Sequence, residues 1–414
     1  MRRVAPGLVL ASLLATSLLA QSELEPPDSA RYLRWGPVRA RPGLNLTNFG
    51  YDDNILLTSD DRKIGDVTAT VSPKLVGLVL FGHGPFLTFE QRFDYTAYAT
   101  HTDQNFLDNH TSGRFTFPIR HRFGVFAEAL FSLTHQRPVD LEELRPEVRG
   151  REAGFGFIFE PGWRTELQLT RTLASYSYQD QDLDSGVEVT RSERLNRDER
   201  GTVLTARYKI WGRTKIIVDG RYRTIDFDLP FVVDNDTINR DTTESRLLGG
   251  LRFGEGGPLR GQFSFGWDNI DAVDPLLQDL STWVARANLA YRLNSRTRFI
   301  LEGERLPGFA LYGANSYYLL SEVELRAVYY FTRIVGIQAA VRGGILSFPD
   351  DPNLLDREDQ LKHYEIGIRF RMMQNSMGRR VEYSFTVRQY QRDSTLENYD
   401  RTATKIGFNA VLGF

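Results

Sequence analysis

Carboxylates stand two positions apart at Glu302 and Glu304, and again at Glu322 and Glu324. Two neighbouring carboxylates are the pair that glycoside hydrolysis uses, one as acid and one as nucleophile or base. A spacing of two, however, puts both groups on one face of a β-strand, where charges are more often simply solvated. Basic residues nearby, such as Arg326, would offset them. The pattern therefore favours a charged wall over a catalytic pair.

Other chemistry-bearing patterns are missing from the sequence. Cysteine is absent, which excludes disulfides and thiolate metal sites, and the six histidines show no metal-ligand spacing. No glycine-rich loop leads from a strand into a helix to cradle phosphate. We expect no enzyme, no cofactor and no bound metal. Lys+Arg 51 against Asp+Glu 53 gives a net charge of −2, so we also expect no nucleic-acid partner.

The elements that carry these charges are predicted to be strands. Between 281 and 293, Trp283, Ala285 and Leu289 fall on one side and Arg286 and Arg292 on the other, and this period of two recurs along the chain. In a barrel that spans a membrane, the polar side would line the lumen. The predicted pore-lining residues are Glu90, Arg92, Asp94, Arg207, Lys209, Arg221, Arg223, Arg286, Arg292, Arg298, Glu302, Glu304, Glu322, Glu324, Arg326, Glu365, Arg369 and Arg388.

A soluble β-sandwich would alternate in the same way, so connection lengths must decide between the two folds. Short turns are predicted near Gly82–Pro85, Arg120–Phe123, Pro161–Arg164, Gly212–Thr214, Glu255–Leu259, Asn294–Arg296, Thr332–Ile334 and Asn375–Gly378. Long polar connections lie between them, as expected for periplasmic turns and extracellular loops. We predict an all-β protein, a transmembrane antiparallel up-and-down β-barrel of about 18 strands (16–18), with both termini periplasmic.

The amino-terminal residues are typical of a secretory signal peptide. Arg2 and Arg3 precede an apolar run from 8 to 20, and Ala20 is a plausible cleavage point. The competing interpretation is a transmembrane anchor, for which the run is short. The predicted organisation is a signal peptide at 1–20, a short periplasmic lead at 21–42 and the barrel at 43–414.

The last strand alternates to the end of the sequence through Ile406, Phe408, Ala410, Leu412 and Phe414. A terminal phenylalanine on such a strand resembles the signal by which bacterial outer-membrane barrels are recognised for assembly. The sequence therefore predicts a location in the outer membrane of a Gram-negative-type cell. The expected partners are outer-membrane lipid and lipopolysaccharide, and the barrel-assembly machinery.

The stretch FGYDDNILLT at 49–58, followed by the strand VTATVSPKLVGL, resembles the start of the putative β-barrel porin 2 family. The motif-like residues are Tyr51, Asp52, Asp53 and Asn54. The resemblance implies a conduit or accessory barrel for exopolysaccharide or capsule export, with periplasmic export proteins as candidate partners. From the residues themselves, hydrogen bonds of an Asx turn are favoured over a calcium site, for which only Asp60 and Asp61 lie nearby.

A barrel of this size leaves an aqueous channel unless something fills it. Arginine is plentiful from residue 207 onward, which suggests a cationic stripe for acidic polysaccharide or other anions. The loop 179–199 is a candidate constriction, with a flexible exterior loop as the alternative. A general diffusion porin for small solutes, and a blocked structural or enzymatic barrel, remain the alternative functions.

Overall fold

The computed structural model describes residues 23–30, 32–82, 84–135, 146–179, 192–233, 236–254, 257–310, 317–348, 357–372, 381–396 and 399–413. Strands dominate this part of the chain, and its helical elements are the short 3-10 turns η2 (Asp60–Arg62), η3 (Thr102–Gln104) and η4 (Ser192–Leu195). Among the described residues, no helix has the length and apolar character needed to span a membrane.

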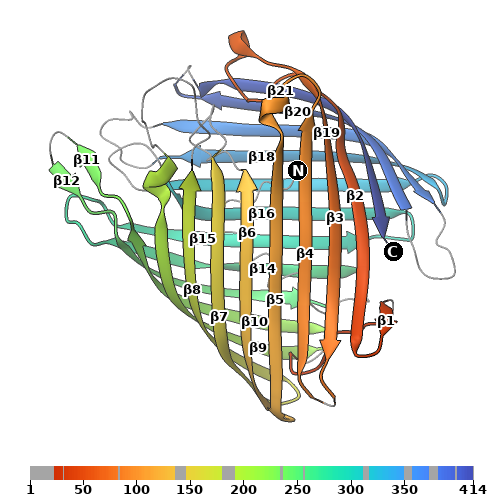
Figure 1. The fold of residues 1–414 in the computed structure, drawn as a ribbon, viewed down its shortest axis with the longest axis vertical. Coiled ribbons are helices and arrows are strands. Elements are labelled where there is room, and N and C mark those ends of the chain that lie inside the picture. Colours follow the sequence, from red (N-terminus) through yellow and green to blue (C-terminus); the bar gives the residue numbers. More distant parts are fainter. Residues whose placement is uncertain are drawn as a thin grey trace.

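Eighteen long antiparallel strands, each paired with its neighbours along the chain, form one sheet that closes on itself (Figure 1). The strands are β2 (Val38–Asp52), β3 (Asp66–Leu80), β4 (Phe86–Tyr98), β5 (Phe106–Arg120), β6 (Phe123–His135), β7 (Glu147–Gly162), β8 (Thr165–Gln179), β9 (Arg197–Trp211), β10 (Thr214–Phe227), β13 (Thr242–Phe253), β14 (Leu259–Ala272), β15 (Leu280–Arg292), β16 (Thr297–Phe309), β17 (Tyr317–Tyr330), β18 (Val335–Ser347), β19 (Glu358–Met372), β20 (Val381–Ser394) and β21 (Arg401–Gly413). The short strand β1 (Leu33–Trp35) pairs with β2, and β11 (Phe231–Val233) pairs with β12 (Asp236–Ile238). Pairing of β2 with β21 closes the barrel, so the predicted fold and strand number are confirmed.

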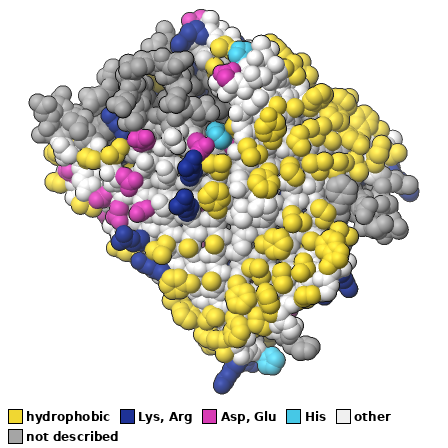
Figure 2. Space-filling view, viewed as in Figure 1, with side chains coloured by type: hydrophobic (Ala, Val, Ile, Leu, Met, Phe, Trp, Pro, Cys, Tyr) yellow, Lys and Arg dark blue, Asp and Glu magenta, His cyan; other side chains and the backbone are white. Residues whose placement is uncertain are grey.

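Alternation along each strand separates the two faces of the wall. On β13, Leu247 is 59% exposed whereas its neighbours Arg246 and Leu248 are buried, and Trp267 opposes Leu247 on β14. Figure 2 shows hydrophobic side chains gathered in a broad region over the outer surface of the strands. A closed barrel has only an outer face and a lumen, so buried charged residues that alternate with exposed apolar ones point inward.

Short turns join the strands at one end of the barrel. The seven predicted turns from 82–85 to 332–334 each fall between consecutive strands, while 375–378 lies outside the described residues. Gly82 and Gly212 have φ of 68° and 53°, a left-handed conformation that glycine adopts without strain. Trp163 and Trp211 are strongly exposed beside these turns, where an interfacial aromatic girdle is expected.

The first barrel strand begins earlier than the sequence suggested. β2 starts at Val38 rather than 43, and β1 already lies within the predicted lead at 21–42. A bulge on β2 interrupts the period of two at Asn48, whose φ is 56°. The predicted signal peptide and residues 180–191 of the predicted constricting loop lie outside the described residues.

The last strand is described from Arg401 to Gly413, with Ala410 buried and Val411 exposed near its end. Ile406 is exposed, and Phe408 packs on Phe385 with ring centroids 4.9 Å apart and on Tyr383 at 5.8 Å. These rings lie on the outward side of β20 and β21, since exposed residues mark that face. Phe414 lies outside the described residues, so its role in assembly stays a prediction.

Candidate functional site in the barrel lumen

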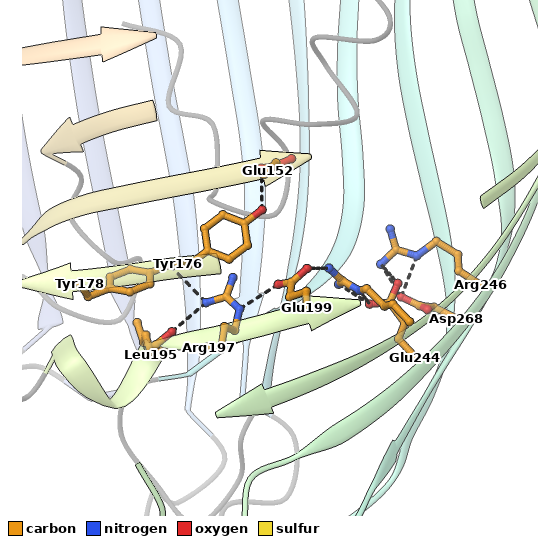
Figure 3. Close-up of polar contacts among 10 residues, drawn as sticks. Glu152, Tyr176, Tyr178, Leu195, Arg197, Glu199, Glu244, Arg246 and Asp268 are labelled. Carbon is orange, nitrogen blue, oxygen red and sulfur yellow. Dashed lines mark hydrogen bonds and ion pairs between the residues drawn. The ribbon is translucent and has the colours of Figure 1, made fainter. Parts of the chain in front are cut away.

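A chain of polar contacts crosses the inner wall from β7 to β14, and its first half lies on β7 to β9 (Figure 3). The Tyr176 hydroxyl donates to the Glu152 carboxylate at 2.7 Å. The Arg197 guanidinium lies 4.6 Å from the centre of the Tyr176 ring and donates to the Tyr178 hydroxyl at 3.4 Å. Its Nε donates to Glu199 at 2.9 Å. Arg197 is thus held between aromatic faces and a carboxylate.

The second half of the chain continues on β10, β13 and β14. The Arg223 guanidinium lies 2.5 Å from a Glu199 oxygen and donates from Nε to Glu244 at 2.6 Å. Arg246 lies 3.2 Å from Glu244 and donates to Asp268 at 2.6 and 3.0 Å. Glu244 and Asp268 are fully buried. Acids and bases alternate across four neighbouring strands, so the charges largely neutralise one another. We call this arrangement, from Glu152 to Asp268, the charge ladder.

A second network lies on β17 to β20. Glu324 accepts from Arg326 at 2.7 Å and from Arg342 at 2.6 Å. On the next strands, Glu365 accepts from Arg388 at 2.7 Å and from the Gln338 amide at 2.5 Å. Such charge-assisted hydrogen bonds fix side chains whose heads would otherwise move freely into a lumen. This side of the wall is therefore also cross-linked by ion pairs.

The predicted pore-lining residues all lie in described strands, but they do not form one group. Several enter ion pairs: Glu90 with Lys74 at 2.6 Å, Arg92 with Asp94 at 3.0 Å, Arg207 with Glu166, and Glu322 with Arg342 at 3.4 Å. Arg223 belongs to the charge ladder, and the second network holds Glu324, Arg326, Glu365 and Arg388. Lys209 lies 5.2 Å from the Trp163 ring, and Arg286 directly opposes Glu304 in the strand register. That these residues line an open passage stays a prediction.

Arginines gather at the short-turn end of the lumen. Arg292 and Arg298 are direct Cα partners on β15 and β16, and Arg260 lies near the same end of β14. All three are exposed, and among the described residues no carboxylate lies within ion-pair distance of them. On β19, Arg369 and Arg371 share an acidic partner, Glu382, at 3.0 and 3.3 Å. We call Arg260, Arg292 and Arg298 the mouth arginines.

Sequence reasoning missed most of the charge ladder. Glu152, Arg197, Glu199, Glu244, Arg246 and Asp268 were not among the predicted residues. The signal was present, because Glu244 and Arg246 share the parity of Leu248 and alternate with Leu247. Glycine-rich β7 and the threonines of β13 weakened the contrast between faces, and the pairing across strands depends on a register that the sequence does not state.

The motif at 51–54 acts at the seam between the first and last strands. The Asn54 amide is buried and donates to the carbonyl oxygens of Thr58 and Thr402 at 2.8 and 3.0 Å. Asp53 accepts from the Thr404 N–H at 2.6 Å, and the predicted Asx hydrogen bond is present, from the Asn54 N–H to Asp52 at 3.2 Å. Within the described part of the chain, no group of three acidic or histidine residues is arranged to hold a metal ion.

Comparison with solved structures shows similar barrels at low sequence identity. OccK2 (OpdF) of Pseudomonas aeruginosa matches with a TM-score of 0.50 and 12% identity, covering 91% of this chain and 98% of that one. OpdK of the same organism matches with a TM-score of 0.47 and 12% identity, covering 91% of this chain and 99% of that one. OccAB3 of Acinetobacter baumannii matches at 0.47 and 9%, again covering 91% and 99%. Identities this low show the fold alone.

Comparison of the sequence with curated proteins gives no match. The model of the family described as putative beta-barrel porin 2, however, matches residues 33–414, which is nearly the whole described chain. The expected family is thereby confirmed, and with it the outer membrane as the location. The chain belongs to the putative β-barrel porin 2 family and is a porin-like outer-membrane β-barrel channel.

Proposed function

We infer that the barrel is a passage for an acidic exopolysaccharide. The polymer class comes from the family resemblance, and the acidic character comes from the mouth arginines. Short turns are periplasmic in barrels of this kind, so the mouth arginines would face the side from which an exported polymer enters. Periplasmic export proteins are the candidate partners at that mouth.

The single observation that carries the proposal is the direct pairing of Arg292 with Arg298. Like charges directly opposite each other on neighbouring strands destabilise a sheet. Among the described residues neither guanidinium forms an ion pair with a carboxylate, Glu382 interacts with Arg298 only at longer range, and both side chains are exposed. A site that retains this repulsion would gain from an anion that bridges the two guanidiniums, since guanidinium binds carboxylate in a bidentate manner.

The rest of the wall supports a hydrophilic polymer. In the charge ladder, acids and bases neutralise one another, so their field falls off over a short distance. Guanidinium and carboxylate groups still offer donors and acceptors to sugar hydroxyls along the path. The cationic character is therefore concentrated at the mouth, and the ladder would let an acidic polymer pass without binding it tightly.

The first test is the reversal potential of the refolded barrel in a planar bilayer under a KCl gradient. We expect anion preference, and loss of that preference in Arg292→Gln/Arg298→Gln. The matched control is Arg149→Gln/Arg151→Gln, which removes the same charge from β7 residues that alternate with buried Gly150 and Glu152 and so face outward. Cation preference in the unmodified barrel, or an equal shift in the control, would refute the cationic mouth.

The second test separates a polymer passage from a diffusion porin. Oligogalacturonate and a neutral malto-oligosaccharide of equal length are added during the recording. Block by the acidic chain alone, lost in Arg292→Gln/Arg298→Gln, supports the proposal. Equal effects of both sugars, or no block with steady conductance, would favour a general diffusion porin. A silent bilayer with folded protein would favour a blocked barrel.

A further inference from the structure

The segment before β1 enters the barrel. The Glu23 carboxylate lies 3.5 Å from the Arg114 guanidinium on β5 and 3.8 Å from that of Arg207 on β9. Four strand spacings separate β5 from β9, which is about 19 Å along the wall. One carboxylate can approach arginines on both strands only from the concave side, so Glu23 lies within the lumen.

The next residue is anchored by apolar contacts. Leu24 is 7% exposed and packs against Phe126 of β6 and Ile158 of β7. A Cβ on Gly124 would lie 2.5 Å from the end of the Leu24 side chain, so glycine at 124 leaves room for the leucine. The Arg114 guanidinium also lies 4.0 Å from the centre of the Phe126 ring. An apolar pocket and a cationic site thus hold neighbouring residues of the same segment.

The cationic site extends beyond the two arginines that contact Glu23. The charge of Arg252 on β13 interacts with those of Arg207 and Glu23. Each of the two arginines is partly offset by a wall carboxylate, since Glu128 lies 3.8 Å from Arg114 and Glu166 pairs with Arg207. The contacts of Glu23 are longer than direct hydrogen bonds, so it is held by charge more than by geometry. A carboxylate that arrives from solution could take its place.

We propose that residues 23–30 form an internal stopper, and that Arg114 and Arg207 form a carboxylate-binding site that Glu23 occupies when the lumen is closed. A solute carboxylate binds the same arginines and releases the segment. Because Glu23 is tethered through the ten positions that separate it from Leu33 of β1, its effective concentration is in the millimolar range, and a competing carboxylate must reach about that concentration. The inference holds whichever solute crosses the barrel.

The first experiment compares two single substitutions on the same segment by single-channel recording. Glu23→Gln removes the carboxylate in the site, and Glu25→Gln removes an exposed one two residues away. We expect Glu23→Gln to raise the ratio of open to closed time about fivefold, as for a partly buried ion pair, and Glu25→Gln to leave it unchanged. Equal behaviour of the two variants would overturn the proposal.

The second experiment locks the stopper in place. The chain has no native cysteine, so Leu24→Cys/Gly124→Cys introduces a single possible disulfide. We expect the oxidised barrel to stay closed and to open after reduction, with both single variants insensitive to oxidant. Leu24→Cys/Phe126→Cys serves as a second pair in case substitution at 124 prevents folding. Equal conductance of the oxidised and reduced forms of a folded, cross-linked pair would overturn the stopper.

The third experiment tests the ligand class. Sodium acetate replaces sodium chloride at constant ionic strength. We expect acetate to raise the open ratio of the unmodified barrel in the millimolar range and to have no effect on Glu23→Gln. The carboxylate site would be refuted if the disulfide closed the cysteine variant but acetate did not open the unmodified barrel. These outcomes are separate from the reversal potential, which reports the mouth arginines.

Discussion

Replacing Glu244 by Gln removes the central charge of the ladder. Glu244 is fully buried and accepts from Arg223 at 2.6 Å while lying 3.2 Å from Arg246. Without its charge, two guanidiniums face each other across β10 and β13. Breaking a buried ion pair by removing one partner costs about 3–5 kcal/mol. Gln retains an acceptor oxygen, so we expect the free energy of unfolding to fall by about 3 kcal/mol, which lowers the folding equilibrium constant by roughly two factors of ten.

The measurement is urea unfolding of the barrel in lipid vesicles, followed by the mobility difference between folded and unfolded protein on unheated gels. Glu90→Gln is the matched control, because Glu90 pairs with Lys74 at 2.6 Å but both side chains are partly exposed, at 23% and 34%. Exposed pairs contribute about 0.2–1 kcal/mol. If Glu244→Gln destabilised the barrel no more than Glu90→Gln, the ladder would not be acting as a set of buried ion pairs.

Two further predictions concern the seam between β2 and β21. Asn54→Ala removes two donated hydrogen bonds and leaves buried carbonyl groups unpaired, so we expect the free energy of unfolding to fall by about 2 kcal/mol in the same assay. The control, Asn294→Ala at an exposed turn, should lower it by less than half as much. Burial would raise the pKa of Asp60, but hydrogen bonds from Thr402 and Lys63 outweigh it and lower that pKa. The contribution of Asp60 to the stability of the seam is therefore full above about pH 3.9 and is lost as the pH falls further. We expect the protection of the Thr402 amide against hydrogen exchange, corrected for the intrinsic exchange rate, to fall in acid. In Asp60→Asn this pH dependence should disappear.

The sequence predicted the barrel because the barrel is built from local signals. Val323 and Leu325 alternate with charged residues, and turn residues such as Gly212 lie between strands. Both signals can be counted along the chain without knowledge of any pairing. The strand number, the order of short turns and the closure of the last strand on the first followed from them.

The site was less predictable because its contacts depend on register. Arg223 was expected on the polar face, but its two acids lie on different strands. Glu244 is its direct partner on β13, and Glu199 lies diagonally from it on β9. The entry of Glu23 into the lumen had no sequence signal, since an isolated acid after an apolar run is ordinary. The repulsion between Arg292 and Arg298 likewise became visible only when the strands were aligned.

Closure of the barrel through β2 and β21 has a consequence for how the protein folds. Asn48 and Asn409, which are hydrogen-bonded across this seam, are separated by 361 positions in the chain. Bringing such distant segments together costs about 5 kcal/mol of chain entropy before any contact forms there. One edge of the first strand therefore stays unpaired until the last strand is available, and the incomplete sheet has two open edges that can pair with other chains. Barrel closure therefore competes with aggregation during export, and a chaperone that covers the strand edges would raise the yield of folded protein.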